Sequence, residues 1–298
     1  MQIPNLIIAG VPKSGTTSLH NWLAKHPQAY GSPVKETYFL EDDASHMFKA
    51  ERNLKTLGAE GYATFFPNVK EEHLWVFEST PNYLYQERAL EYFKERAEKP
   101  LIIFSFRNPT ERILSQYNYN LYTLGKFSKE VSLADFIDFG LQSSATYIEI
   151  EGHRLLNPIE ANKYSKYLKV WLESFAKEQF VFLDFEQIKQ KPKAVLCKLS
   201  DRLAIEKEFW SSFEIDRSNP SDYNRSTKLY HLLNKVAKKQ KALMPLTNLI
   251  QNWNTLPKPE LQESDLQKLR GLDPYFSDWN KELSELTNLD LSGWSFKK

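Results

Sequence analysis

Residues 10–18 read Gly-Val-Pro-Lys-Ser-Gly-Thr-Thr-Ser, between the apolar run Leu6–Ala9 and the helix-like stretch Leu19–Leu23. A strand that turns through glycines into a helix leaves several backbone N–H groups without a partner inside the helix. The helix dipole adds partial positive charge at the same point, so such a turn binds a phosphate or sulfate oxygen. Lys13 adds a cation, and hydroxyl donors are available from Thr16, Thr17 and Ser18. The stretch therefore predicts a strand, an anion-binding loop and a helix, in that order.

The loop differs from the phosphate loop of nucleoside triphosphatases, G-x-x-x-x-G-K-[ST], in which the lysine follows the second glycine and the next hydroxyl binds Mg²⁺. Gly10 and Gly15 keep the spacing, but Thr16 occupies the lysine position and Lys13 stands before Gly15. The pattern thus keeps the anion cradle and alters the apparatus for a γ-phosphate and its metal. A strand-to-helix turn without a ligand is the alternative interpretation.

The composition sets the outer limits. A chain of 298 residues can bury a substantial core, and we expect one α/β domain over 1–298, although the length would also allow two. The motif-bearing core is expected over about 5–205, with a mainly helical or irregular extension over about 206–298. Lys and Arg number 39 against 38 Asp and Glu, so no bulk charge indicates nucleic acid or a membrane as partner, and any anion site must be local.

Cysteine and histidine usage predicts no metal site. The single cysteine, Cys197, excludes an intramolecular disulfide framework and is expected to pack on a helix face. The six histidines are scattered, and His20 and His26 are expected to cap or pack the first helix. There is no signal-peptide pattern and no apolar run of about 18 to 20 residues, so we expect a soluble, cytoplasmic protein.

Apolar runs alternate with helical patterns along the chain, which favours βα units around a central, mainly parallel sheet flanked by helices, a three-layer α/β fold. We expect strands at Leu6–Ala9, Leu74–Phe77, Leu101–Phe106 and Phe180–Leu183. The expected helices cover 16–25, 87–97, a stretch that begins at Pro109, 164–175 and 192–203. The run at 101–106 is nearly continuously apolar, as a central parallel strand should be.

A second candidate phosphate site involves Arg107 and Ser115. Arg107 follows the apolar strand at the carboxyl edge, where open α/β sheets bind ligands, and Ser115 lies on the helix that begins at Pro109. A guanidinium group matches a phosphate bidentately, and a hydroxyl can add a donor. In the alternative interpretation Arg107 pairs with an acid such as Glu78, and Ser115 only packs.

Two motifs together resemble a known family. Residues 12–17 match the P-K-[ST]-G-T-[TS] loop, and residues 107–117 match R-N-P-x-E-R-x-x-S-x-Y, of sulfotransferases that use 3′-phosphoadenosine 5′-phosphosulfate (PAPS). The resemblance covers roughly residues 5 to 205. It implies a P-loop-NTPase-like fold and transfer of a sulfuryl group from PAPS to an acceptor hydroxyl of a carbohydrate, lipid or small molecule, with release of adenosine 3′,5′-bisphosphate.

The resemblance also implies roles for residues. Backbone amides around Ser14 to Thr17, with hydroxyls of the same loop, would hold the 5′-phosphate, and Lys13 would stabilise charge on the bridging oxygen of the departing group. Arg107 and Ser115 would hold the 3′-phosphate. Since PAPS has no γ-phosphate, positioned cations and amides suffice and no metal is required. Arg225 lies where the family often closes a loop over the 3′-phosphate and adenine. The implied cofactor-binding set is Lys13, Ser14, Gly15, Thr16, Thr17, Ser18, Arg107, Ser115 and Arg225.

Two acidic residues are candidate general bases. The segment 32–40 is similar to the Lys-Glu-x-His-Phe-Phe element of heparan sulfate-type sulfotransferases, whose glutamate acts as base, so Glu36 is the first candidate and Tyr38 replaces the histidine. Such a base benefits from a pKa raised toward neutrality. A surface carboxylate in a loop is the alternative for Glu36.

Residues 78–83 are similar to the Glu-Lys-Thr-Pro-x-Tyr segment of the same enzymes, with Ser79 in place of a lysine that lies near the sulfuryl group or acceptor. This departure leaves the acceptor open, including O- against N-sulfation. Glu78 is the second candidate for the base or for acceptor orientation, and an ion pair with Arg107 or Lys13 is its alternative.

Other residues have weaker claims. His46 and His153 are alternative bases, because many small-molecule sulfotransferases use a histidine. Aromatic side chains can line an acceptor pocket, stack on adenine or fill the core, namely Tyr83, Tyr117, Tyr119 and Tyr122. The basic stretch 235–241 is either a solvated helix face or the border of an entrance for an anionic ligand.

Two other functions compete with sulfuryl transfer. A P-loop kinase or NTPase would use Mg·ATP, but the displaced lysine and the lack of a clear Walker B acid after an apolar strand oppose it. A non-catalytic nucleotide-binding protein would bind PAPS without transfer.

Overall fold

The computed structural model describes residues 3–216, 223–240 and 243–296. The chain forms two compact units that alternate along the sequence. The first unit comprises Met1–Arg107, Lys163–Ser218 and Ser277–Trp294, and the second comprises Asn108–Asn162, Asn219–Phe276 and Ser295–Lys298. The one-domain organisation expected from the sequence stays a prediction, because alternating units are compatible with one domain or two.

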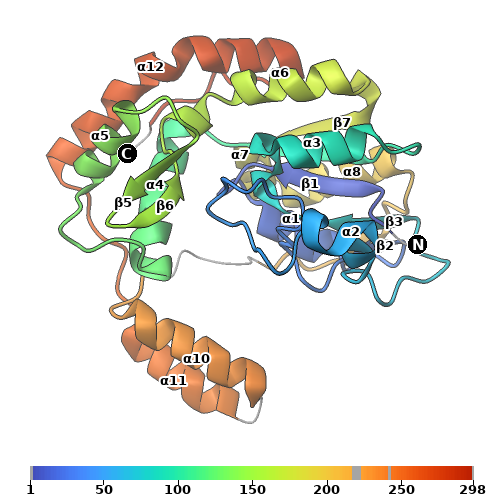
Figure 1. Ribbon diagram of the computed structural model, residues 1–298, viewed down its shortest axis with the longest axis horizontal. Helices are drawn as coiled ribbons and strands as arrows, with labels where there is room; N and C mark the ends of the chain where they lie inside the picture. The colour runs from blue at the N-terminus through green and yellow to red at the C-terminus, as the bar shows by residue number, and fades with distance from the viewer. Residues whose placement is uncertain (1–2, 217–222, 241–242, 297–298) are drawn as a thin grey trace. The chain divides into compact units, whose positions relative to one another are not determined.

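A five-stranded sheet forms the centre of the first unit, in the order β2-β3-β1-β4-β7 (Figure 1). All neighbouring strands are parallel. This confirms the predicted α/β fold with a parallel central sheet. The strands are β1 (Leu6–Gly10), β2 (Ala29–Gly31), β3 (Trp75–Glu78), β4 (Leu101–Phe106) and β7 (Phe180–Asp184).

Helices cover both faces of this sheet. Leu6, Ile8 and Ile103 pack in one buried cluster with side chains of α1 (Thr16–Leu23), α7 (Phe185–Gln190) and α8 (Pro192–Leu203). On the other face, Phe104 and Phe106 contact Trp171 and Tyr164 of α6 (Tyr164–Ser174). Consecutive side chains of a strand point to opposite faces, so β4 serves both layers and must be apolar throughout.

The first unit also contains the helices α2 (Leu54–Ala63) and α3 (Glu87–Lys94). Its remaining elements are short, namely α9 (Phe209–Ser212) and the 3-10 turns η1 (Pro81–Tyr85) and η4 (Lys177–Gln179). The four predicted strands are present within one residue at each end. The first helix ends at Leu23 rather than Lys25, and neither β2 nor α2 was predicted. Three residues of strand, and a helix interrupted by Gly58 at φ 61°, carry too little periodicity to be recognised.

The second unit is mainly helical. It contains α4 (Pro109–Asn118), the π-helical turn η2 (Tyr119–Leu124), α5 (Leu133–Leu141), the 3-10 turn η3 (Glu160–Asn162), α10 (Thr227–Lys239) and α11 (Met244–Asn254). An antiparallel hairpin joins β5 (Tyr147–Ile150) to β6 (His153–Leu156). The long helix α12 (Glu263–Thr287) begins in this unit and continues into residues of the first. Across 3–216, 223–240 and 243–296, every helix is too short or too polar to cross a membrane.

Candidate active site

The loop between β1 and α1 has the geometry expected of an anion cradle. Lys13 and Gly15 both adopt positive φ angles, 70° and 82°. Gly15 is the N-cap of α1, and a Cβ added there would lie 3.1 Å from the ring of Phe185. Glycine is therefore required at this position both for its backbone conformation and for space.

The first turn of α1 leaves its amides open to a ligand. No side chain caps the helix, and no acidic residue lies in its first turn. The backbone N–H groups that follow Gly15 belong to the set that an α-helix cannot satisfy internally. Together with the helix dipole, they form a site for an anionic oxygen. The hydroxyls of Thr16, Thr17 and Ser18 lie on this same turn.

The neighbouring strand β4 holds the loop in place. The Ser105 hydroxyl donates a hydrogen bond to the Ser14 carbonyl at 2.5 Å, and the Val11 N–H donates to the Ser105 carbonyl at 2.8 Å. Ser14 is fully buried, and its Oγ has no hydrogen-bond partner in the part of the chain that the structure describes. A buried hydroxyl without a partner is costly, so this atom is suited to receive a ligand group.

Arg107 lies beside the same loop. Its Nη1 donates to the Lys13 carbonyl at 3.3 Å, and its guanidinium lies 4.6 Å from the ring centre of Phe185. The Tyr164 hydroxyl fixes the backbone by donating to the Arg107 carbonyl at 2.9 Å. Arg107 does not pair with Glu78, which was the alternative interpretation from the sequence. The structure thus places a second cationic group next to Lys13, at the carboxyl edge of the sheet.

The other two predicted phosphate ligands belong to the second unit. Ser115 is a half-buried residue of α4. Arg225 is exposed, its guanidinium lies 5.5 Å from the ring centre of Trp253, and its N–H donates to the Asn254 carbonyl at 2.8 Å. Their participation in a site with Lys13 and Arg107 stays a prediction.

Glu36 sits on a segment that runs beside the end of β3. The Ser32 N–H donates to the Phe77 carbonyl at 2.8 Å, and the Ser79 N–H donates to the Lys35 carbonyl at 2.9 Å. The Glu36 carboxylate is only 30 % exposed, so it is not a plain surface carboxylate. It pairs with the Lys35 ammonium and accepts a hydrogen bond from the Tyr38 hydroxyl.

The surroundings of Glu36 favour its ionised form. Burial by itself raises the pKa of Glu36, but the Lys35 charge, the hydrogen bonds from Lys35 and Tyr38 and the Lys13 charge together hold that pKa below its ordinary value of 4.5. The free protein therefore does not have the raised pKa from which a general base benefits. Glu36 is ionised at neutral pH, able to accept a proton, and electrostatically linked to Lys13.

Glu78 has a different environment. Its carboxylate is fully buried and accepts hydrogen bonds from four hydroxyls at 2.5 to 2.9 Å, those of Thr37, Tyr62, Thr80 and Tyr83. The ion pair with Arg107 or Lys13 is not formed. Burial raises the pKa of Glu78 despite these four bonds. Glu78 therefore holds together the end of β3 and the segment that carries Glu36.

The sequence did not predict a buried contact between the side chains of His20 and Ser79. The Nδ1 atom of His20 lies 2.8 Å from the Ser79 hydroxyl, and His20 packs against the ring of Phe77. Burial, followed by the Lys35 charge, lowers the pKa of His20 to about 4, so this imidazole is neutral at pH 7. No sequence pattern indicates that His20 lies close to Lys35, because this depends on how α1 packs against residues 32–36. The Ser79 hydroxyl, which occupies the position of the family's lysine, is thus engaged by His20.

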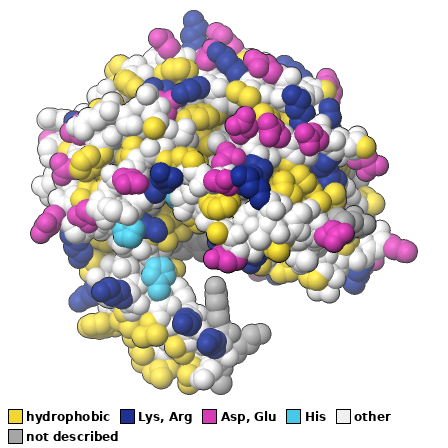
Figure 2. Space-filling model, viewed as in Figure 1, with side chains coloured by type: hydrophobic (Ala, Val, Ile, Leu, Met, Phe, Trp, Pro, Cys, Tyr) yellow, Lys and Arg dark blue, Asp and Glu magenta, His cyan; other side chains and the backbone are white. Residues whose placement is uncertain are grey.

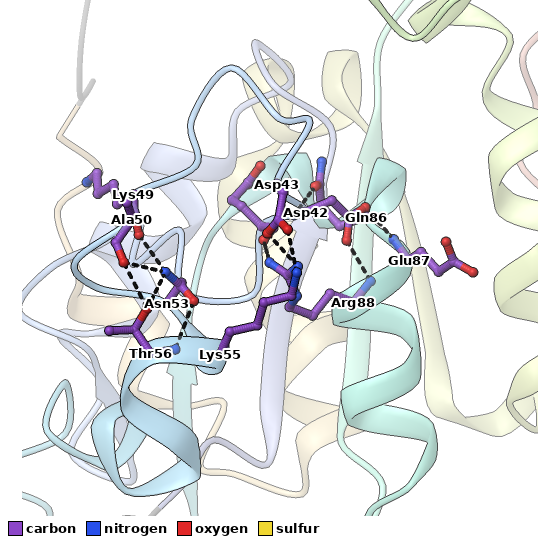
Figure 3. Close-up of polar contacts among 11 residues, drawn as sticks. Asp42, Asp43, Lys49, Ala50, Asn53, Lys55, Thr56, Gln86, Glu87 and Arg88 are labelled. Carbon is purple, nitrogen blue, oxygen red and sulfur yellow. Dashed lines mark hydrogen bonds and ion pairs between the residues drawn. The ribbon is translucent and has the colours of Figure 1, made fainter.

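The loop that follows Glu36 is anchored to two helices (Figure 3). Asp42 accepts hydrogen bonds from the N–H groups of Glu87 and Arg88, both at 2.9 Å, at the start of α3. Asp43 pairs with Arg88 and Lys55, as Figure 3 shows. At the other end, the Asn53 side chain caps α2 and also donates to the carbonyls of Lys49 and Ala50. These contacts define the path of residues 41–56.

The other residues considered from the sequence are four tyrosines, two histidines and the single cysteine, and most of them make contacts within the protein. The Tyr83 hydroxyl is part of the Glu78 network, and Tyr117 packs with Phe127 and Phe136. Tyr119 is exposed, and Tyr122 contacts Tyr223. His153 is exposed in β6, while His46 lies in the loop that follows Asp43. Cys197 is a partly buried free thiol packed against the core, as expected. No group of three or more His, Cys, Asp or Glu side chains could hold a metal ion among the residues that the structure describes.

Comparison with known proteins identifies the family. Residues 4–243 match the model of the sulfotransferase domain. The chain is 27% identical over 204 residues to bifunctional heparan sulfate N-deacetylase/N-sulfotransferase 1 of Caenorhabditis elegans, covering 68% of this chain and 22% of that protein. It is 25% identical over 207 residues to heparan sulfate glucosamine 3-O-sulfotransferase 3A1 of Mus musculus, covering 69% and 47% of the two chains. This chain thus spans less than half the length of either relative.

Solved structures confirm the fold. A sulfotransferase from Alicyclobacillus acidocaldarius superimposes with a TM-score of 0.70 at 21% identity and covers 99% of both chains. Mouse sulfotransferase SULT7A1, complexed with PAP, gives a TM-score of 0.51 at 17% identity over 97% of this chain and 88% of the other. Since the family model spans most of the chain and the loop, β4 and Arg107 have the geometry described above, the chain belongs to the family of PAPS-dependent sulfotransferases.

Proposed function

We propose that the protein transfers a sulfuryl group from PAPS to an acceptor hydroxyl and releases adenosine 3′,5′-bisphosphate. The observation that carries this proposal is the hydrogen bond from Arg107 to the Lys13 carbonyl. This bond places a guanidinium beside a phosphate loop whose lysine stands before the second glycine. The phosphate loop of a nucleoside triphosphatase does not need such a guanidinium. A donor with two separate phosphate groups has a use for both.

In this proposal the donor is held by groups of the loop, by Arg107 after β4 and by two residues of the second unit. The amides of residues 14–17 and the hydroxyls of Thr16, Thr17 and Ser18 bind the 5′-phosphate, and the partnerless Ser14 hydroxyl is available at the same place. Arg107 binds the 3′-phosphate, with Ser115 and Arg225 contributing from the second unit. In this proposal amides and cations supply all the stabilisation, and no metal takes part.

Lys13 assists the departure of the nucleotide. The acceptor oxygen attacks sulfur in line, the bond between sulfur and the bridging oxygen breaks, and negative charge collects on the 5′-phosphate. An ammonium beside that oxygen lowers the barrier because its interaction with the oxygen is stronger in the transition state than in the bound substrate. The left-handed backbone of Lys13 fixes the start of its side chain on the loop.

Glu36 accepts the proton of the attacking hydroxyl. Its carboxylate is ionised before the donor binds, because Lys35, Tyr38 and Lys13 favour the charged form. Once the donor's phosphate groups engage Lys13, less of that cation's charge acts on Glu36. The pKa of Glu36 then rises, which improves the carboxylate as a base at neutral pH.

Glu78 and His20 position this base rather than react. Glu78 fixes Thr37, directly after Glu36, and Thr80, whose Oγ1 accepts a hydrogen bond from the Tyr38 N–H at 3.3 Å. His20 engages Ser79, so no cation extends from this position toward the acceptor. The acceptor is a hydroxyl of a carbohydrate, lipid or small molecule, with an amine as the second candidate class.

A transfer assay tests the proposal. Labelled PAPS is incubated with mixed carbohydrate, lipid and small-alcohol acceptors in EDTA, and both the labelled product and adenosine 3′,5′-bisphosphate are measured. We expect equal amounts of the two, which Lys13→Ala and Glu36→Gln sharply reduce. Transfer of phosphate from Mg·ATP to the same acceptors, without use of PAPS, would instead establish a kinase.

A further inference from the structure

The helix α11 carries an exposed apolar stripe. Leu246, Leu249 and Trp253 follow one another at three- and four-residue spacing and are 54%, 68% and 66% exposed. Residues at this spacing share one helix face, which in a soluble protein normally faces the core. Another side of α11 carries the buried polar residues Thr247 and Asn254. The helix thus buries polar side chains while its apolar stripe stays exposed.

The preceding helix α10 adds a basic face. Lys228, Lys235 and Lys239 are exposed and share one side of the helix with Leu232, which is 57% exposed. Leu233, on the other side, is buried. The two helices contact each other, and we term the pair the α10–α11 hairpin, residues 227–239 and 244–254 (Figure 1).

The charge of this region is one-sided. Residues 223–259 contain no Asp or Glu, whereas their basic residues are Arg225, Lys228, Lys235, Lys238, Lys239, Lys241 and Lys258. The whole chain has a net charge of only +1, so the remainder of the chain carries more acidic than basic residues. Figure 2 shows hydrophobic and basic side chains next to each other on the hairpin, at the bottom of the view.

The combination of apolar and basic side chains decides between possible partners. A second copy that met this hairpin with its own hairpin would bring the same positive charge, which opposes such a contact. A purely anionic partner, such as a polysaccharide, would neutralise the lysines and leave Leu246, Leu249 and Trp253 in water. An anionic lipid surface satisfies both, because headgroups attract the lysines while the boundary region accepts leucine and tryptophan side chains.

We propose that the α10–α11 hairpin binds the surface of membranes that contain anionic lipids, with Leu246, Leu249 and Trp253 inserted at headgroup depth. Binding of this kind lies in the plane of the interface and needs no helix that spans the bilayer. It does not depend on the proposed reaction, since neither the apolar stripe nor the lysines of α10 are part of the proposed donor site or of the proposed chemistry.

Vesicle binding tests this proposal. The full chain is sedimented with phosphatidylcholine vesicles that either contain or lack phosphatidylglycerol, at low and high salt. We expect binding only to the anionic vesicles, weakened by salt, and accompanied by a blue shift in tryptophan emission that is smaller in Trp253→Phe.

Surface variants assign the binding to the hairpin. Leu246→Ser/Leu249→Ser should weaken vesicle binding about tenfold or more, since two leucines no longer leave water. Lys228→Gln/Lys235→Gln/Lys239→Gln should reduce both the affinity and its salt dependence. The matched control is Leu74→Ser/Val170→Ser, which removes two comparably exposed apolar residues of the first unit and should bind as the parent does. Circular dichroism and thermal unfolding, measured in parallel, verify that every variant is folded.

Four results would overturn the proposal. They are absence of binding to anionic vesicles, equal binding to neutral ones, equal loss in the control variant, and self-association that Leu246→Ser/Leu249→Ser abolishes. The last would assign the stripe to a second copy of the chain. Capture by a soluble sulfated polysaccharide without vesicle binding would assign the lysines to a polyanion. All of these outcomes are independent of whether PAPS is the donor.

Discussion

The Nη1 atom of Arg107 donates a hydrogen bond to the main-chain carbonyl of Lys13, at 3.3 Å. Arg107 directly follows one central strand, and Lys13 belongs to the loop that follows the neighbouring strand. The guanidinium of Arg107 thus contacts the main chain of the loop that carries the Lys13 ammonium. This arrangement allows separate roles for the two cations, which substitutions can distinguish.

Lys13→Ala should lower kcat by about 10²- to 10³-fold, because the ammonium stabilises charge that develops only in the transition state. Donor affinity should change much less. Single-turnover transfer and equilibrium binding of adenosine 3′,5′-bisphosphate measure the two effects. Lys25→Ala, an exposed lysine shortly after α1, is the control and should behave as the parent. Equal losses in binding and in rate would contradict a transition-state role.

Arg107→Ala should weaken adenosine 3′,5′-bisphosphate binding by about 10- to 100-fold, the loss expected for a charge-assisted hydrogen-bond pair. Binding of adenosine 5′-monophosphate, which lacks the 3′-phosphate, should barely change. Calorimetric titration with both nucleotides measures the ratio of their two affinities. Arg202→Ala, on the exposed side of α8, is the control. If Arg107→Ala still discriminates between the two nucleotides as the parent does, its assignment is wrong.

Glu36→Gln should lower kcat by about 10²- to 10⁴-fold, the range of general base catalysis, and leave nucleotide binding intact. In the parent, the acidic limb of kcat/KM should lie below pH 4.5, the ordinary pKa of a glutamate, because the pKa of Glu36 is lowered in the free protein. Activity should fall as the pH drops through that pKa.

Lys35→Gln tests whether the Lys35 charge is what lowers the pKa of Glu36. Its charge is the largest effect that lowers the pKa of Glu36, so its removal should raise this pKa and move the acidic limb to higher pH. Lys70→Gln, an exposed lysine paired with Glu72, should leave the limb in place. An acidic limb that moves equally in both variants, or in neither, would show that another group titrates.

Glu41 should make the protein less stable at alkaline pH. Burial raises the pKa of Glu41 to about 8, and Oε1 has no hydrogen-bond partner in the described part of the chain. The folded state therefore keeps this proton while the unfolded state loses it above its ordinary value of 4.5. The free energy of unfolding should fall as the pH rises from about 4.5 to about 8, by roughly 2 to 5 kcal/mol.

Glu41→Gln should remove this pH dependence. The difference in the free energy of unfolding between variant and parent should therefore shift in favour of the variant between pH 5 and pH 9. Urea unfolding at both pH values measures the difference. Glu51→Gln, an exposed residue of the same loop, should follow the parent at both. A parent whose stability is constant across this range would contradict a buried, neutral Glu41.

The sequence is sufficient to predict the parallel sheet, the loop and the place of Arg107, because each depends on local patterns. An apolar run, two glycines and a basic side chain after a strand carry their structural meaning within a few residues. Parallel pairing then brings Gly10 and Arg107 to one edge of the sheet. The position of Ser115 relative to this edge depends on the second unit, and sequence patterns do not determine it.

Contacts between distant segments could not be predicted. Glu36 has a lowered rather than a raised pKa because Lys35 and Tyr38 turn their polar groups toward it, which no spacing rule indicates. The four hydroxyls around Glu78 come from residues as far as 41 positions from it along the chain. His20 meets Ser79 across 59 residues. Such pairings depend on how α1, β3 and the 32–40 segment pack together.

The outward stripe of α11 shows a different limit. Leu246, Leu249 and Trp253 have the periodicity of a helix face that packs on a core, yet they are exposed. Periodicity identifies an apolar face but does not say what covers it. The basic residues of the same region were therefore open to two interpretations from the sequence, and the exposed stripe beside them favours a lipid surface.

The measurement that tests the central claim most directly is calorimetric titration of the parent protein with three nucleotides in EDTA and in Mg²⁺. The account predicts that adenosine 3′,5′-bisphosphate binds without Mg²⁺ and about tenfold or more tighter than adenosine 5′-monophosphate, with no gain for ATP when Mg²⁺ is added. Equal affinity for adenosine 3′,5′-bisphosphate and adenosine 5′-monophosphate, or tight binding of ATP only with Mg²⁺, would contradict it.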